Sequence, residues 1–187
     1  MDEGAAITSA KTAAPALGKR QIGAAASALV AASIGEIALV LARSPETKHN
    51  FLADLEWLVL PAVFNRQFYV VQAANQETGF RAPIAFVTWA LVSEAVDRRL
   101  EADLGQRIRL KPEEWKSGEI AWIVDLVGAP AGVRQALQWL KAGPFRGRPA
   151  KVVVRDAKGI ARVEMVERSK AEFTKDATSA SDAGGFE

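Results

Sequence analysis

The chain has 187 residues, of which 49% are hydrophobic and 25% are charged, and its formal net charge is +2. These values are typical of a soluble globular protein with one domain and a flexible tail or two, and the small net charge argues against a chain-wide nucleic-acid-binding surface. The absence of cysteine excludes disulfides, a thiol nucleophile and cysteine-ligated zinc, and the single histidine excludes multi-histidine sites, so we expect no metal.

The composition divides the chain into three parts. Residues 1–22 are rich in alanine, threonine and lysine and lack apolar periodicity, which predicts a disordered leader. Residues 168–187 are dominated by serine, aspartate, alanine and glycine, which predicts a disordered tail. A single folded domain is therefore expected over residues 23–167.

The apolar segment Gln21–Ala42 has close to membrane-spanning length and follows Lys19 and Arg20, so it also resembles a signal-peptide core or an anchor. Its alanine, glycine and serine residues are only weakly apolar. Glu36 would cost a few kcal/mol inside a bilayer. We therefore expect a helix of a soluble protein from about residue 24 to 43, without stable membrane insertion.

The next segments predict a helix and a hairpin. Ser44 suits an N-cap and Pro45 the first position of a second helix, which we expect to continue past His49 until Pro61 ends or kinks it. Residues 67–73 and 81–93 have the β-branched and aromatic residues of strands and flank a loop at 75–79, which predicts a β-hairpin.

The remaining segments complete an α+β pattern. We expect a charged helix at about 94–103, a helical turn at 111–115, and a strand at 119–127 that is apolar enough to be central. The loop Gly128–Gly132 then leads into a helix ending near Gly143. Residues 151–155 and 160–166 flank a turn sequence and predict a second hairpin. This order predicts an α+β fold with a mostly antiparallel central sheet flanked by helices.

Four groups of residues, taken in order, resemble a known family. They are Ser44-Pro45 followed by His49; Leu60-Pro61-Ala62 followed by Gln67-Phe68-Tyr69; Pro83-Ile84-Ala85 followed by Thr88-Trp89-Ala90 and Ser93; and Trp115-Lys116-Ser117-Gly118 followed by Trp122-Ile123-Val124-Asp125 and Ala129-Pro130-Ala131-Gly132. With these motifs, the segment from Gly35 to about Val154 resembles the toxin-activating lysine acyltransferases of the haemolysin-activating type. These enzymes look like a variant of the GCN5-type N-acyltransferase fold.

The resemblance implies both a reaction and its residues. It places the catalytic histidine at His49 and the essential aspartate at Asp125. It also implies an acyl-carrier-protein thioester as co-substrate, an internal lysine of an RTX protoxin as acceptor, no permanently bound cofactor, a cytoplasmic location and a homodimer. The chain departs from the family pattern in the longer interval before His49, the longer alanine-rich leader, and Ala131 where phenylalanine is common.

The implied chemistry suits these two residues. A free lysine amine has a pKa near 10.4 and must lose a proton before it attacks a thioester. A histidine, with a pKa near 6.5, can take that proton, and Asp125 could orient the imidazole. Direct attack by His49, forming an acyl-imidazole, is the alternative mechanism. A surface or structural role competes for a lone histidine, and a structural salt bridge competes for Asp125.

Further candidates surround this pair. Ser44 could position the donor, although N-capping explains it equally well, and the loop Gly128–Gly132 could hold a phosphopantetheine or an oxyanion. The usual CoA signature is absent there, which favours a carrier-protein donor over acyl-CoA acting on another amine. A non-catalytic or membrane-associated protein is a third interpretation. The candidates for docking an acidic carrier protein, or for an ordinary solvated face, are Arg134, Lys141, Arg146 and Arg148.

Overall fold

The computed structural model describes residues 19–156 and 158–166. In chain order the elements are α1 (Lys19–Arg43), the 3-10 turn η1 (Leu52–Asp54), α2 (Leu55–Leu58), α3 (Leu60–Asn65), β1 (Phe68–Ala74), β2 (Arg81–Val92), α4 (Glu94–Ala102), the 3-10 turn η2 (Pro112–Trp115), β3 (Ile120–Gly128), α5 (Pro130–Ala142), β4 (Ala150–Arg155) and β5 (Ala161–Val166). The predicted α+β class is confirmed.

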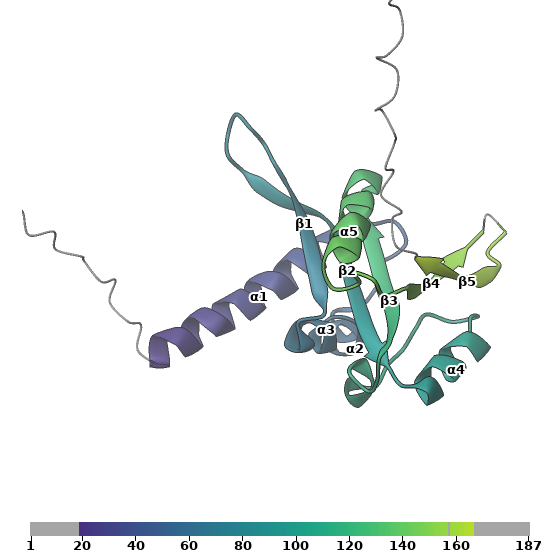
Figure 1. Ribbon diagram of the computed structural model, residues 1–187. Coiled ribbons are helices and arrows are strands. Elements are labelled where there is room, and N and C mark those ends of the chain that lie inside the picture. Colours follow the sequence, from purple (N-terminus) through teal and green to yellow (C-terminus); the bar gives the residue numbers. More distant parts are fainter. Residues whose placement is uncertain (1–18, 157, 167–187) are drawn as a thin grey trace, which may run out of the picture.

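The five strands form one sheet in the order β1-β2-β3-β4-β5 (Figure 1). Strand pairs β1–β2, β2–β3 and β4–β5 are antiparallel, and β3–β4 is parallel. Both predicted hairpins are therefore confirmed, and the mostly antiparallel sheet carries one parallel pairing. Helix α5 supplies the crossover that joins the parallel strands. This arrangement is consistent with an N-acyltransferase-like fold.

Apolar side chains pack on both faces of the sheet. On one face, Leu140 of α5 joins a cluster with Ile123 of β3. On the other, Ile37 of α1 packs in a cluster with residues of α2, α3 and the sheet. A third cluster around Trp115 and Trp122 fixes α4 and η2. The strands are thus covered by helices on both sides, as the near-continuous apolar sequence of β2 requires.

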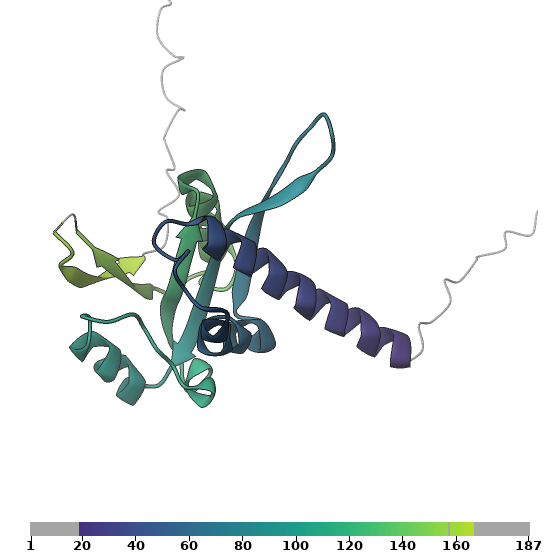
Figure 2. The same ribbon diagram turned by 180° about the vertical axis from the view of Figure 1, so that it is seen from behind.

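Among the residues of α1 whose burial is described, those from Val30 onward pack against the domain. Ile37, Val40 and Leu41 are buried there, whereas Leu29 is 70% exposed, and the helix extends away from the sheet (Figures 1 and 2). By length and composition, Gly23–Arg43 would suffice to cross a membrane, and 17% of its most apolar window is buried. The C-terminal end of α1 therefore belongs to the domain core.

Two boundaries differ from the predictions. Helix α1 begins at Lys19, inside the segment predicted to be a leader; residues 1–18 and the predicted tail at 168–187 lie outside the described residues. Residues 45–49 form turns in place of the predicted second helix, and helical structure resumes only at Leu52. Pro61 lies at the start of α3, just after the break that separates this helix from α2, as its predicted role as a kink requires.

Ser44 ends a helix instead of capping a new one. Its hydroxyl donates to the carbonyl oxygen of Val40 at 3.0 Å, and its own carbonyl oxygen accepts from the backbone N–H groups of Thr47 and Lys48. These bonds close α1 and start the turn. The predicted N-cap is therefore wrong. A serine hydroxyl can donate back to the preceding helix as readily as it can cap a following one, so the residue type does not distinguish the two roles.

Asp97 connects α4 to the sheet. It accepts hydrogen bonds from Trp122 Nε1 at 2.7 Å and from Lys151 Nζ at 2.8 Å, and Lys151 also contacts Glu101 at 2.7 Å. Burial disfavours the charge on Lys151, but its hydrogen bonds to Asp97 and Glu101 raise its pKa above the ordinary value. The lysine is therefore held as a cation between two carboxylates.

Asp97→Ala is expected to lower the free energy of unfolding by about 3 kcal/mol, because it leaves a lysine and an indole N–H without their buried acceptor. Glu101→Ala removes the exposed partner of the same lysine and is expected to cost about 0.5 kcal/mol. Urea denaturation followed by circular dichroism measures both values. Equal losses in the two variants would contradict the assigned role of Asp97.

Candidate functional site

The candidate site is a cavity at the point where β3 and β4 separate. Their pairing runs from Ala121 opposite Ala150 to Ile123 opposite Val152. Beyond these residues the two strands line an open cavity of about 510 Å³, with Asp125 in its wall. In this region the facing edges of β3 and β4 therefore border a cavity, whereas in a continuous sheet they would be hydrogen-bonded to each other.

A β-bulge at Val124 sets the face of the sheet on which Asp125 lies. The register between β2 and β3 shifts there by one residue. Regular alternation would place Asp125 on the face of Ile123, against α5. Beyond the bulge, Leu126 packs with the α5 cluster and Val127 with the α1 cluster. The extra residue thus turns Asp125 toward α1 and α2.

Asp125 is buried and is bound by Arg107. Both Nε and Nη2 of Arg107 donate to Oδ1, at 3.1 and 2.6 Å. The second oxygen, Oδ2, is buried and has no hydrogen-bond partner among the described residues. Burial raises the pKa of Asp125 above its ordinary value, while the charge and hydrogen bonds of Arg107 act in the opposite direction. A perturbed carboxyl group in a cavity is a recognised mark of a functional site.

The raised pKa of Asp125 predicts a pH-dependent loss of stability. The folded state holds the proton more tightly than the unfolded state, so this contribution is fully present below the ordinary carboxyl pKa and is lost as the pH rises through the raised value. Asp125→Asn cannot ionise and is expected to gain stability relative to wild type as the pH rises above the ordinary carboxyl pKa of about 4. Urea titrations at several pH values measure this difference, and a constant difference would contradict the prediction.

His49 lies in the turn after α1, and its side chain is exposed. Thr47, in the same turn, is buried, and its hydroxyl donates to the carbonyl oxygen of Leu41 at 2.8 Å. Glu46 and Thr47 line the same cavity as Asp125. The turn is therefore anchored to α1 beside the cavity. His49 comes two residues after Thr47 in the sequence.

The structure brings His49 and Asp125 to one region without joining them. Asp125 is bound by Arg107, and its hydrogen bonds within the described part of the chain do not include His49. The expected contact between the imidazole and the carboxylate stays a prediction. The salt bridge that competed for Asp125 is present, with Arg107 as the partner.

Two of the predicted donor-binding residues share a second cavity. Ser44 and Gly128 line a hollow of about 350 Å³, together with Arg43 and residues of β2. Gly128 and Ala129 precede α5, which begins at Pro130, so the predicted loop Gly128–Gly132 is shorter than expected. The N-terminus of α5 and the end of β3 thus lie beside the turn that carries His49.

Gly132 has a packing role. It is buried in the first turn of α5, and a Cβ atom there would lie 2.7 Å from the Cβ of Ala85. It is not among the residues that line either cavity. Glycine at this position lets α5 approach β2 closely, which explains the residue without any contact to a ligand.

The four predicted docking residues lie on α5 and in the segment that follows it. Arg134 and Arg146 are exposed, and Lys141 is half-buried. Arg148 forms an ion pair with Glu119 at 3.0 Å, which occupies its guanidinium group. The basic character of this region therefore comes mainly from Arg134, Lys141 and Arg146.

Sequence reasoning missed the cluster around Trp57. Its Nε1 donates to Asp54 at 3.0 Å, and the guanidinium carbons of Arg109 and Arg107 lie 4.2 and 5.8 Å from its ring centroids. The hydrogen bond from Trp57 is the main cause that lowers the pKa of Asp54. The only local signal was the pair Arg107 and Arg109 in a loop, which does not reveal that they meet α2 and β3.

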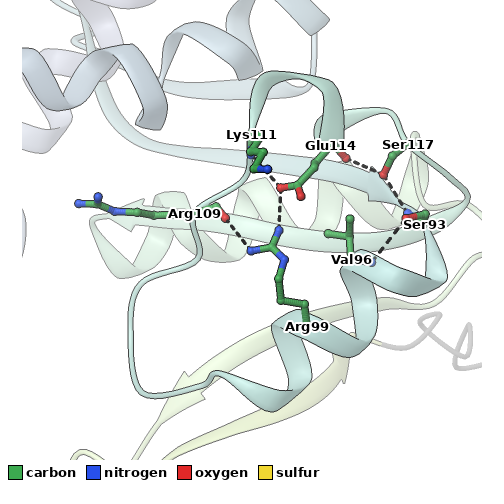
Figure 3. A network of polar contacts seen from close by, with 7 residues as sticks. All are labelled: Ser93, Val96, Arg99, Arg109, Lys111, Glu114 and Ser117. Carbon is green, nitrogen blue, oxygen red and sulfur yellow. Dashed lines mark hydrogen bonds and ion pairs between the residues drawn. The ribbon is translucent and has the colours of Figure 1, made fainter.

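The loop that carries Arg107 is held at its C-terminal end by a network of polar contacts (Figure 3). Arg99 of α4 donates to Glu114 of η2 at 2.6 Å, and Glu114 also accepts from the backbone N–H of Lys111 at 2.8 Å. The hydroxyl of Ser117 accepts from the backbone N–H of Ser93 at 2.9 Å. These contacts fasten the loop 103–111 between α4 and η2.

Comparison with known families gives one match over most of the chain. The model of the RTX toxin acyltransferase family matches residues 27–168. The matched region contains both cavities, the turn at His49 and the strand that carries Asp125.

Individual relatives match the chain at about one third identity. The leukotoxin-activating lysine-acyltransferase LktC of a Pasteurella haemolytica-like species is 34% identical over 104 residues, which cover 56% of this chain and 57% of the relative. The RTX-II toxin-activating lysine-acyltransferase ApxIIC of Actinobacillus pleuropneumoniae is 31% identical over 99 residues (53% and 56%). The lysine-acyltransferase RtxC of Vibrio cholerae is 33% identical over 101 residues (53% and 59%). The chain spans about half the length of the curated relatives it matches.

Proposed function

The chain belongs to the RTX toxin acyltransferase family, and on that premise we propose that it transfers a fatty acyl group from an acyl-carrier-protein thioester to lysine side chains of an RTX-type protoxin. The names of its relatives, toxin-activating lysine-acyltransferases, support this reaction and this class of acceptor. The structural observation that carries the proposal is the cavity between β3 and β4, with Asp125 in its wall and the turn of His49 at its rim.

The shape of the cavity supports a phosphopantetheine-bound donor. A pantetheine arm is an extended chain with two amide groups, and the unpaired edges of β3 and β4 offer backbone donors and acceptors to such a chain. The two cavities are lined by successive residues of β3 and the start of α5, from Ile123 to Ala129. The N-terminus of α5, with Arg43 and Ser44 nearby, is suited to the phosphate.

The proposed chemistry uses His49 to remove a proton from the lysine ammonium group. The free amine attacks the thioester carbonyl carbon, the new C–N bond forms, and the C–S bond breaks. The proton taken first passes to solvent; the imidazole then takes a second proton from the attacking nitrogen and gives it to the leaving thiolate, so an amide, a free thiol and one released proton are the products. In the alternative, the imidazole of His49 takes the acyl group first and passes it to the amine. Asp125 orients and stabilises the imidazole in either route.

We propose further that the donor is delivered by an acyl carrier protein in the cytoplasm and that the enzyme is a homodimer, as the family resemblance implies. The exposed basic residues Arg134 and Arg146 beside α5 suit an acidic carrier. Their contribution is electrostatic, so it acts mainly on the rate of encounter and weakens with salt.

Incubating the chain with acyl carrier protein loaded with a fatty acyl group and with a candidate RTX protoxin tests the function directly. Intact-mass analysis should show the protoxin gaining one or more acyl groups, and peptide mapping should place them on lysine. A protoxin of unchanged mass across several candidate partners and chain lengths would count against the reaction.

A parallel reaction with acyl-CoA separates the alternative function. Both donors carry the same pantetheine arm, so the cavity along β3 suits either of them. Acylation from acyl-CoA at an equal or greater rate would favour a GCN5-like enzyme that acts on another amine. Acylation only from the carrier protein supports the proposed donor.

A further inference from the structure

We propose that Arg107 is a positioning residue for acyl transfer: it holds one oxygen of Asp125 and leaves the other free to accept a hydrogen bond from the imidazole of His49. The inference rests on the proposed function, because it assigns the partner of a residue in the same site. It concerns a residue that neither the sequence motifs nor the family resemblance singled out.

The geometry of the ion pair carries the inference. An arginine and a carboxylate usually meet with two parallel hydrogen bonds, one to each oxygen. Here Nε and Nη2 of Arg107 both donate to Oδ1 of Asp125, at 3.1 and 2.6 Å. Oδ2 is left buried and without a partner among the described residues, in a carboxyl group that lines the cavity. A purely structural salt bridge usually satisfies both buried oxygens of its carboxylate.

Arg107 is itself held in place from three directions. Arg155 of β4 donates to the backbone carbonyl oxygens of Leu104, Gly105 and Gln106, at 3.0, 3.3 and 3.4 Å. Arg109 stacks on Trp57 of α2. Arg99 ties the end of the segment to Glu114, as Figure 3 shows. A loop anchored to β4, α2 and η2 can hold a guanidinium group in one orientation, as positioning requires.

The charge of Arg107 has a second effect. Burial raises the pKa of Asp125 and so favours the protonated carboxyl, which cannot stabilise an imidazolium ion as a carboxylate does. Arg107 opposes that effect and favours the carboxylate. The other charged residues that line the cavity are Glu46 in the turn after α1 and Arg155 on β4, and Asp54 and Arg109 lie near Arg107 around Trp57. Arg107 is the group that bonds to Asp125 directly.

Arg107→Gln tests the inference on the full-length chain. Without the guanidinium group the pKa of Asp125 should rise, and the acidic limb of the kcat profile should move to higher pH. Once that pKa exceeds the assay pH, kcat should fall about tenfold for each further unit, with little change in KM for the acyl donor. Arg107→Lys keeps a cation but loses the paired donors and should restore part of kcat. Carbon-13 NMR of the aspartate carboxyl groups, assigned with Asp125→Asn, follows the titration without an activity assay.

Arg109→Gln is the matched control. It removes the same charge and one anchor from the same loop but leaves the hydrogen bonds of Arg107 to Asp125 in place, so the carboxyl titration should shift much less than in Arg107→Gln. An unchanged Asp125 titration in Arg107→Gln, or equal shifts in both variants, would overturn the inference. A higher KM with an unchanged kcat would assign Arg107 to donor binding and would also overturn it. The NMR titration needs no substrate. It therefore tests the role of Arg107 even if the chain proves not to catalyse the proposed acylation.

Discussion

Replacing His49 with alanine is expected to lower acyl transfer by a factor of roughly 10² to 10⁴, because the lysine ammonium group then has no positioned base. The side chain is exposed on a turn that is anchored by Thr47, so the free energy of unfolding should stay within about 0.5 kcal/mol of wild type. Single-turnover acylation of the protoxin, followed by intact mass, measures the loss.

Lys48→Ala is the matched control for His49. Lys48 is the preceding residue of the same turn and is also exposed, and the proposed mechanism gives it no part. Activity near that of wild type in Lys48→Ala, with a large loss in His49→Ala, supports a chemical role. Comparable activity in wild type and His49→Ala would exclude that role.

Incubation with the donor alone distinguishes the two routes through His49. An acyl-imidazole would raise the mass of the wild-type enzyme by one acyl group in the absence of protoxin, and the His49→Ala variant would lack this increase. A general base forms no such species, so the enzyme mass would stay constant while the protoxin is still acylated when it is added.

The largest expected loss of stability is at Gly128. Its φ angle is +130°, and a Cβ atom there would lie 2.3 Å from the carbonyl oxygen of Ile84, which also accepts the backbone N–H of Ala129 at 2.8 Å. Gly128→Ala therefore combines an unfavourable backbone conformation with a backbone clash and is expected to cost at least about 3 kcal/mol. Thermal and urea unfolding measure the loss.

Gly35→Ala provides the comparison. Gly35 is in α1, and a Cβ atom there would meet nothing within 4 Å. The substitution should raise stability by about 0.5–1 kcal/mol, because alanine is the better helix former. A Gly128→Ala variant as stable as Gly35→Ala would show that the end of β3 adjusts easily.

The sheet was predictable because its signals are local. Alternating or continuous apolar residues with turn residues between them located both hairpins, and the apolar strand 119–127 proved to be the central β3. The prediction of a second helix starting at Ser44 was wrong, because Ser44 and Pro45 suit the start of a helix as well as the turn that ends one. Only the packing of Thr47 against the end of α1 separates the two outcomes.

The environment of the candidate site could not be predicted in the same way. His49 and Asp125 were selected through the family resemblance, and nothing local indicates the bulge at Val124 that turns Asp125 toward α1. Arg107 meets Asp125 across 18 residues of sequence, through a loop whose course depends on Arg155 and Trp57. Contacts of this kind arise from tertiary structure, which neither periodicity nor propensity describes.

The short parallel pairing of β3 and β4 also has a mechanical consequence. Three residue pairs join the backbone of the β4–β5 hairpin to the rest of the sheet, and apolar side chains of both strands pack against the core clusters on either side. The backbone ladder between β3 and β4 is therefore short, so separating these two strands breaks fewer backbone hydrogen bonds than separating any other pair in the sheet. The cavity beside Asp125 lies along this short ladder, so the proposed carrier arm would enter between β3 and β4 without any strand of the central β1–β2–β3 sheet being separated.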